Sequence, residues 1–200
     1  GLVGSEMCIR DSSPASVVRF CKKLGFSGYS DFKASLRMDL FEPEETPRKS
    51  HPTDFFRDIH KTIEMVSEET VERIVELIHC SRRIELYAVG SSRMPGSELA
   101  KRLQTIGKAA FCYDDSTLMN ISARQLTSDD LVLALSISGE TSLIIAAATV
   151  AKSRGAALVS FTNLGSNTLS GMADENLYVN ATNFVCSGLQ VRSRVQLLML

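Results

Sequence analysis

The stretch from Leu131 to Gly155 limits the possible folds of this chain more than any other. It opens with the apolar run Leu131–Leu135, which is typical of a strand covered on both faces and is too short for a buried helix. The hexapeptide Ser136–Thr141 (SISGET) follows, and an alanine-rich helical pattern then continues to Gly155. A strand, a hydroxyl-rich turn and a helix in this order predict an anion site, because the first turn of a helix carries unpaired N–H groups and partial positive charge.

The residue types in this turn suit a phosphate group. Gly139 allows the backbone to approach a bound group closely, and the hydroxyls of Ser136, Ser138 and Thr141 can donate to phosphate oxygens. The turn contains no lysine and does not match the loop that binds nucleoside triphosphates, so a compact sugar monophosphate fits better. The alternative is a serine-rich loop whose hydroxyls only cap the following helix.

Apolar runs and helical patterns alternate from Arg83 onward. Strands are predicted at Ile84–Val89, Ala110–Tyr113, Leu131–Leu135, Ala157–Phe161 and Asn176–Val179. Helices are predicted at about Pro95–Ile106, Leu118–Gln125 and Ser142–Lys152, with a short one near Leu169. This alternation predicts an α/β fold with a mainly parallel sheet flanked by helices, in which a ligand binds at the carboxyl ends of the strands near the switch in strand order.

The turn resembles the phosphosugar-binding motif of SIS (sugar isomerase) domains, S-x-S-G-x-T, which also lies between a buried strand and a helix. The resemblance implies that the phosphate is held by Ser136, Ser138, Gly139 and Thr141. It also implies a hydroxyl from the loop after the first strand, where Ser92 occupies the position and Ser91 lies beside it. Ser91 could equally be a helix cap. Thr162 and Asn163, at the end of the fourth strand, are further candidates.

The segment after Ser13 has a different character. Ser13 suits a helix N-cap and Pro14 suits the first helical position, and an amphipathic pattern then runs to Gly25. Five basic residues and one acidic residue lie between Ser13 and Arg37, which indicates an anionic partner. A short helix with small and basic residues outward is what reading the major groove of DNA needs, although an ordinary surface helix has the same periodicity.

This segment resembles the end of the helix-turn-helix domain of the RpiR family of bacterial regulators. The match runs through V-V-R-F-x-x-K-L-G-F at 17–26 and then Gly28, Tyr29, Asp31, Phe32 and Lys33. The resemblance implies DNA contacts from Arg19, Lys22 and Lys23, with Ser16 as a base-edge contact. It also places further helices before Ser13, so we expect this chain by itself to bind operator DNA poorly.

The expected organisation has five parts. Residues 1–12 are interpreted as a non-native terminus, because Met7–Ser12 (MCIRDS) resembles the translation of an adapter used in preparing sequencing libraries. Residues 13–42 are the end of an all-α helix-turn-helix domain, 43–52 a proline-rich linker, and 53–81 connecting helices that restart near Ser67 and Thr70. Residues 82–200 are the SIS-type domain, which the resemblance implies continues beyond the apolar helical run Val195–Leu200.

Composition is that of an ordinary globular protein, with 44% hydrophobic and 22% charged residues. The five cysteines show no C-x-x-C spacing, and the histidines have no metal-ligand spacing, so reduced thiols and no metal or other cofactor are expected. No apolar run is long enough to span a bilayer and the chain does not open with a secretory signal, so the protein is expected to be cytoplasmic.

Together these features predict a transcriptional regulator of carbohydrate metabolism that senses a sugar phosphate. Its expected partners are that effector, operator DNA and further copies of the chain, as a dimer or tetramer, with no membrane. The alternative function is an aldose–ketose isomerase with the same fold, which would need a base to move a proton between adjacent carbons. Glu140 and Glu98 are the nearby carboxylates, but no histidine follows His79, so the enzyme is the weaker hypothesis.

Overall fold

The computed structural model describes residues 18–19, 22, 52–186, 189–192 and 197. The chain divides into two units, Gly1–Arg48 and Lys49–Leu200. In the first unit, the described residues Val18, Arg19 and Lys22 are helical, in agreement with the pattern that follows Ser13. Ser16 and Lys23, the other predicted DNA contacts, lie outside the described residues.

Five parallel strands form the sheet of the second unit, in the order β2-β1-β3-β4-β5. The strands are β1 (Arg83–Ala88), β2 (Ala110–Tyr113), β3 (Asp130–Leu135), β4 (Ala157–Asn163) and β5 (Glu175–Val179). All residues of the central strand β3 are buried, as its apolar run predicts. The predicted α/β fold with a mainly parallel sheet is therefore confirmed.

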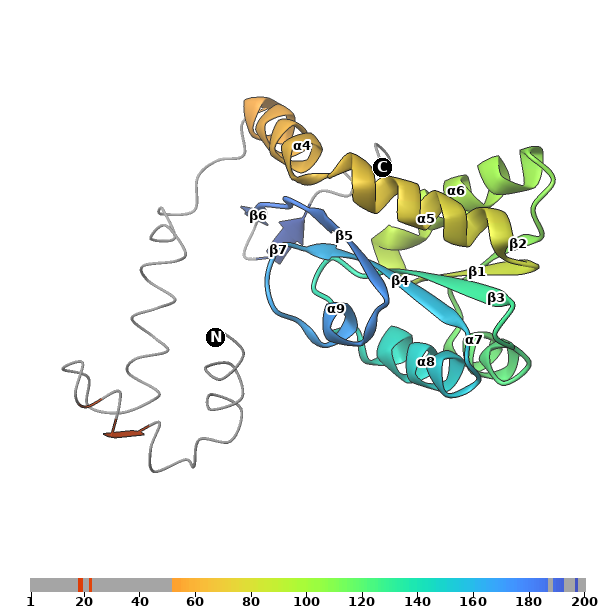
Figure 1. The fold of residues 1–200 in the computed structure, drawn as a ribbon. Coiled ribbons are helices and arrows are strands. Elements are labelled where there is room, and N and C mark those ends of the chain that lie inside the picture. Colours follow the sequence, from red (N-terminus) through yellow and green to blue (C-terminus); the bar gives the residue numbers. More distant parts are fainter. Residues whose placement is uncertain (1–17, 20–21, 23–51, 187–188, 193–196, 198–200) are drawn as a thin grey trace, which may run out of the picture. The chain divides into compact units, whose positions relative to one another are not determined.

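Helices cover both faces of this sheet (Figure 1). The helices are α4 (Pro52–Met65), α5 (Glu68–Cys80), α6 (Arg93–Thr105), α7 (Ser116–Ala123), α8 (Ser142–Ser153) and α9 (Thr168–Met172). Helices α5 and α6 lie over one face, whereas α7 and α8 lie over the other. Strand alternation explains the two layers, because Leu133 points into the first apolar cluster and its neighbours Val132 and Ala134 point into the second. Among the described residues, no helix has both the length and the apolar character that crossing a membrane requires.

The junction between α4 and α5 follows the sequence prediction. The Ser67 side chain caps α5 by accepting a hydrogen bond from the backbone N–H of Thr70, with an Oγ–N distance of 3.1 Å. The acidic residues Glu68 and Glu69 occupy the first turn of α5, where the helix dipole favours negative charge. The long helical region expected between residues 53 and 80 is thus two helices with a restart at Ser67.

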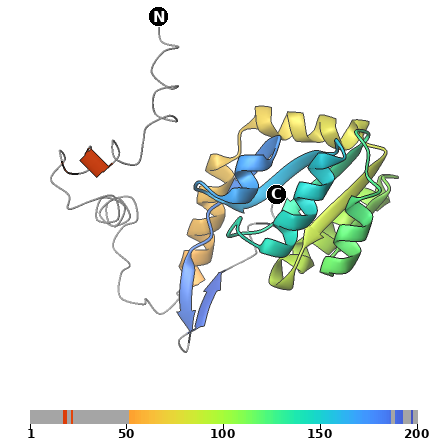
Figure 2. The ribbon, with the colours of Figure 1, turned by 90° about the horizontal axis from the view of Figure 1, so that it is seen from below.

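The region after β5 differs from expectation. The sequence pattern predicts only a helical last segment there, but β6 (Asn183–Cys186) and β7 (Leu189–Arg192) form a separate antiparallel pair with Cys186 opposite Leu189. Figure 2 shows this hairpin projecting from the domain. These strands are only four residues long, which is too short for apolar alternation to distinguish them from a loop or helix. The described residue of the last segment, Leu197, is helical.

Close packing of α6 on the sheet depends on Gly96. A Cβ atom at Gly96 would lie 2.9 Å from the Cβ of Ala88 and 3.2 Å from the Sγ of Cys112, which is tighter than normal contact. The first half of α6 can therefore approach β1 and β2 closely only because this position has no side chain.

We predict that Gly96→Leu lowers the free energy of unfolding by about 1–3 kcal/mol or more, since the added side chain overpacks the interface. Urea denaturation of the variant and the parent chain measures the difference. Gly171→Leu is the matched control, because a Cβ at that helical glycine would meet no other atom within 4 Å. Equal stabilities of the two variants would contradict the packing role of Gly96.

Candidate functional site

The carboxyl ends of β1 and β3 lie side by side at the point where the strand order reverses. The chain passes from β1 outward to β2 and then returns to place β3 on the other side of β1. Loops that leave β1 and β3 consequently diverge and leave a crevice between them, which is the usual ligand position in such sheets. The short 3-10 turn Gly90–Ser92 follows β1, and the hexapeptide Ser136–Thr141 follows β3.

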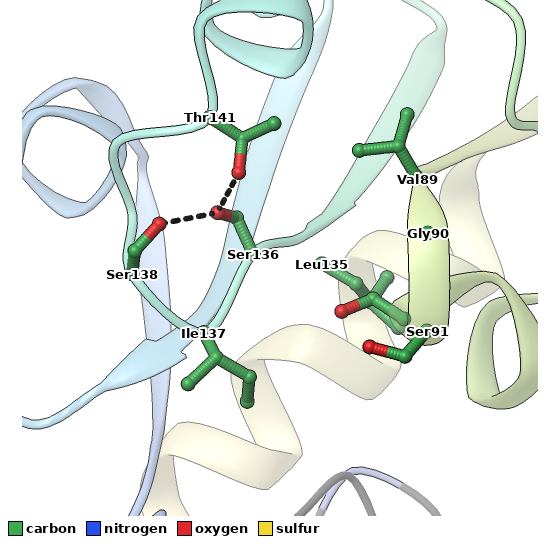
Figure 3. Close-up of a pocket in the computed structure, with 9 residues that line it drawn as sticks. Val89, Gly90, Ser91, Leu135, Ser136, Ile137, Ser138 and Thr141 are labelled. Atoms are coloured by element: carbon green, nitrogen blue, oxygen red, sulfur yellow. Dashed lines mark hydrogen bonds between the residues drawn. The ribbon is translucent and has the colours of Figure 1, made fainter. Parts of the chain in front are cut away.

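A pocket of about 210 Å³ occupies this crevice (Figure 3). Both loops contribute to it, and the lining residues are Val89, Gly90, Ser91, Ser92, Leu135, Ser136, Ile137, Ser138 and Thr141. Five of the six residues predicted to bind the phosphosugar are in this set. The sixth, Gly139, lies in the same turn but outside the lining. The sequence did not indicate the apolar members Val89, Leu135 and Ile137, because the first two belong to predicted buried strands and Ile137 has no polar group that would suggest a ligand contact.

Three hydroxyl groups converge in the turn after β3. The Oγ atom of Ser136 lies 2.8 Å from Oγ1 of Thr141 and 3.4 Å from Oγ of Ser138, within hydrogen-bond distance of both. Figure 3 shows the Ser138 and Thr141 hydroxyls pointing toward Ser136. The three oxygens therefore form a compact group of donors and acceptors on one side of the pocket.

These hydroxyls do not serve as caps for the helices that follow. Thr141 occupies the N-cap position of α8 and Ser92 that of α6, yet neither side chain makes a capping hydrogen bond. The Ser138 hydroxyl does accept a bond from the backbone N–H of Glu140, at 3.2 Å. The alternative in which the serine-rich loops exist only to cap helices is thus not supported at α6 or α8. Both helices begin next to the pocket and bring partial positive charge to it.

The backbone of the turn is held by Gly139 and its neighbour across the fold, Asn167. Gly139 has a φ of 65°, and its N–H donates to the carbonyl of Ser136 at 2.9 Å. The Asn167 side chain occupies the place where a Cβ of residue 139 would be. Asn167 in turn caps α9 by accepting from the N–H of Ser170 at 2.9 Å. No local pattern in the sequence indicates this contact, which joins segments that follow different strands.

The Glu140 carboxylate also fixes the turn, by accepting hydrogen bonds from Thr168. Its two oxygens accept hydrogen bonds from the backbone N–H of Thr168 at 2.7 Å and from the Thr168 hydroxyl at 2.8 Å. These bonds to the charged form lower the pKa of Glu140 below its usual value, the backbone bond having the larger effect. Glu140 is not part of the pocket lining, and its carboxylate is already committed to the start of α9.

The further candidates at the end of β4 lie outside the lining. Thr162 is fully buried, and its Oγ1 accepts a bond from the side-chain amide of Asn167 at 3.2 Å. The side-chain oxygen of Asn163 accepts from the backbone N–H of Ala181 at 2.8 Å. Both side chains therefore form hydrogen bonds with neighbouring loops and do not line the pocket. Of the serines after β1, Ser92 is buried and Ser91 is exposed.

The chemistry available in the pocket is that of anion binding. Its lining offers hydroxyls, two helix starts and apolar walls, and contains no histidine or carboxylate. Hydroxyls and backbone N–H groups can surround the oxygens of a phosphate ester. A proton-transfer reaction would need an ionisable group within reach of the substrate, and the described lining provides none.

Comparison with known proteins identifies two family regions. Residues 77–200 match the SIS domain, and residues 9–43 match the helix-turn-helix domain of the rpiR family. The HTH-type transcriptional regulator YbbH of Bacillus subtilis, itself described as uncharacterized, is 28% identical over 194 residues, which are 90% of this chain and 69% of that protein. The chain thus spans about two thirds of the length of this relative.

Solved structures agree with this assignment. The Vibrio vulnificus NanR protein, solved in complex with ManNAc-6P, is 33% identical, with a TM-score of 0.62 over 86% of this chain and 65% of that one. The sugar isomerase domain of an RpiR transcription factor from Sphaerobacter thermophilus superposes with a TM-score of 0.68 over 74% of this chain and 80% of that one. At 20% identity the second similarity concerns the fold alone.

We predict that Gly139→Ala destabilises the chain more than Gly107→Ala does. Both glycines have positive φ, 65° and 85°, so an alanine is strained at either position. Only at Gly139 would the methyl group also overlap Asn167, whereas a Cβ at Gly107 meets nothing within 4 Å. Overpacking should add roughly 1–3 kcal/mol to the loss in unfolding free energy, as measured by urea denaturation. A smaller effect at Gly139 would rule out the contact.

We further predict that the hydrogen bonds of the Glu140 carboxylate with Thr168 are lost in acid. Because the folded-state pKa is lowered, the carboxylate stabilises the fold above the ordinary pKa of 4.5, and this contribution disappears as the pH falls through the folded value. Glu140→Gln should therefore be less stable than the parent chain at neutral pH, with a difference that shrinks below pH 4.5. Solvent screening keeps the effect small. Glu72→Gln, on the exposed surface of α5, is the control for a general loss of charge.

Proposed function

The chain belongs to the RpiR family of HTH-type transcriptional regulators that carry a SIS domain, and on this premise we propose that it senses a sugar phosphate and controls genes of carbohydrate metabolism. The effector binds in the pocket between β1 and β3. Its phosphate contacts the hydroxyls of Ser136, Ser138 and Thr141, with Ser92 contributing from the opposite loop, while Ser91 contacts the sugar.

One observation carries the proposal. Three hydroxyls lie together at a helix start, and the hydroxyl in the N-cap position, that of Thr141, makes no capping bond. Hydroxyls in such a position can turn from each other to the oxygens of a bound phosphate at little cost, since the backbone of the turn is already fixed by the contacts of Asn167 and Glu140. Partial positive charge at the starts of α6 and α8 adds to the attraction.

The size of the pocket indicates how much of the effector it encloses. A volume of about 210 Å³ is below the range of roughly 300–1,000 Å³ that is common for pockets of small molecules. The pocket therefore suits the phosphate and the adjoining carbon, and the sugar ring lies at its mouth against the exposed Ser91. ManNAc-6P, the ligand of the NanR complex, is the first effector to test, because that protein is 33% identical to this chain.

DNA binding is assigned to the segment before the linker. Arg19, Lys22 and Lys23 contact phosphates and Ser16 contacts a base edge. The effector changes DNA binding only if it binds two arrangements of the protein with different affinity. A homo-oligomer provides such arrangements, because paired DNA-reading domains must match the spacing of two half-sites.

An isomerase is the second candidate, because solved structures described as phosphosugar isomerases share this fold. Two observations count against it. The Glu140 carboxylate is hydrogen-bonded to Thr168, and Glu98 pairs with Arg102 on the surface of α6 with an Oε1–Nε distance of 3.0 Å. Turnover of ManNAc-6P or fructose 6-phosphate by the natural protein would support the enzyme, whereas effector-dependent release from promoter DNA would support the regulator.

We predict that Ser138→Ala abolishes the rise in melting temperature that ManNAc-6P causes in the parent chain. A hydrogen bond to a charged group contributes about 1.5–3 kcal/mol, so its loss should weaken binding by roughly tenfold to a hundredfold. Ser153→Ala is the matched control, because that hydroxyl lies at the far end of α8 and donates to the carbonyl of Val150 at 2.6 Å. An undiminished shift in the Ser138 variant would count against the site.

A further inference from the structure

Helix α4 contains a buried carboxylate, that of Asp58, which forms hydrogen bonds with the segment that follows β5, residues 180–182. The side chain of Asp58 is almost fully buried. Its oxygens accept hydrogen bonds from the backbone N–H of Thr182 at 2.8 Å, from the Thr182 hydroxyl at 2.7 Å and from the side-chain amide of Asn180 at 2.7 Å. Bonds to a charged, buried acceptor are short and strong, so Asp58 fixes α4 against this segment.

A second residue of α4 strengthens the same contact. Thr62, also buried, accepts the backbone N–H of Asn180 at 3.0 Å and donates its own hydroxyl to the carbonyl of Asp58 at 2.7 Å. By contrast, the apolar side chains Phe56 and Ile63 of α4 are 72% and 55% exposed, so they contribute little to its attachment in this chain. Among the residues of α4 whose burial is described, Asp58 and Thr62 are the buried ones, so their hydrogen bonds to residues 180–182 contribute strongly to the position of this helix.

Residues 180–182 are also connected to the pocket, by hydrogen bonds through Asn163. The backbone N–H of Ala181 donates to the side-chain oxygen of Asn163 at 2.8 Å. The backbone N–H of Asn163 in turn donates to the carbonyl of Ile137, again at 2.8 Å. Ile137 lines the pocket between Ser136 and Ser138. Asn163 is therefore bonded both to the hydroxyl-rich turn and to the segment that Asp58 holds.

We propose that Asn163 and Asp58 are positioning residues that couple occupancy of the pocket to the placement of α4. The inference rests on the proposed phosphosugar site. An effector that shifts or stiffens the turn moves the Ile137 carbonyl, and the hydrogen bonds of Asn163 pass this change to Ala181. Asp58 and Thr62 then pass it to α4, which begins at Pro52, directly after the unit Gly1–Arg48 in the chain.

The hydrogen bonds that connect Ile137 to α4 are suited to passing on a displacement of the turn. They are 2.7–3.0 Å long, and the residues at the α4 end are buried. A displacement of one partner therefore either displaces the next or leaves a buried polar group unpaired, which is costly. Coupling along such a route is a free energy, and it must be measured rather than inferred from proximity.

Hydrogen–deuterium exchange of the whole chain provides the measurement. Calorimetry first establishes that ManNAc-6P, or failing that inorganic phosphate, binds. At saturation, exchange should slow by about fivefold or more in α4 and at residues 180–182, as well as in the turn. Binding without any change in α4 would overturn the coupling and leave the phosphosugar site intact. Failure of both ligands to bind would overturn the proposed function itself, and the coupling with it.

Two pairs of variants test whether the coupling between the pocket and α4 depends on Asp58 and Asn163. Asp58→Asn should bind the ligand as the parent chain does but lose the response of α4, while Glu64→Gln, which removes an exposed carboxylate of the same helix, should keep it. Asn163→Leu should lose the response at residues 180–182 and in α4, and Asn163→Asp, which retains an acceptor oxygen, should restore it. A parent-like α4 response in a folded Asp58→Asn or Asn163→Leu chain would refute the assignment.

Discussion

The parallel pairing of β1 with β3 is the constraint on which the rest of the structure depends. Because these two strands are neighbours in space but not consecutive in the chain, the loops that leave them turn in different directions and leave room between them. Their register places Ala88 beside Leu135, so the two loops leave the sheet at the same level, with Val89 and Ser136 as the next residues of each chain segment. A change in this register would separate the two groups of serines, and the pocket would no longer have two walls.

The pocket combines hydroxyls that remain available with a backbone that is fixed. Three residues outside the lining fix the backbone. The Asn167 side chain fills the space beside Gly139, the Glu140 carboxylate accepts hydrogen bonds from Thr168, and the backbone N–H of Asn163 donates to the carbonyl of Ile137. Because other groups also hold the turn, the hydroxyls of Ser136 and Thr141, which bond to each other, are not needed to fix its backbone. Preorganisation of this kind reduces the entropy that a ligand must overcome on binding.

Much of this arrangement could be predicted from local sequence patterns. The apolar run Leu131–Leu135 predicted the central strand, and three of the four residues singled out in the hexapeptide after it, Ser136, Ser138 and Thr141, line the pocket. The patterns could not predict the contacts of Asp58 with Asn180 and Thr182, because these residues are more than 120 positions apart and none lies in a distinctive motif. The β6–β7 hairpin was missed for a different reason, since its strands are too short to show a period. The DNA contacts assigned to Ser16, Arg19, Lys22 and Lys23 stay predictions, as do the phosphate contacts assigned to the pocket.

The absence of ionisable side chains from the described pocket lining has a consequence for how binding responds to acidity. Hydroxyls, backbone amides and helix dipoles keep the same charge throughout the physiological range. A phosphate ester, by contrast, loses its second proton near pH 6. If a phosphate ester binds here as proposed, any variation of its affinity with pH would originate in the ligand, because the dianion would be held more firmly than the monoanion while the charge of the pocket stays the same.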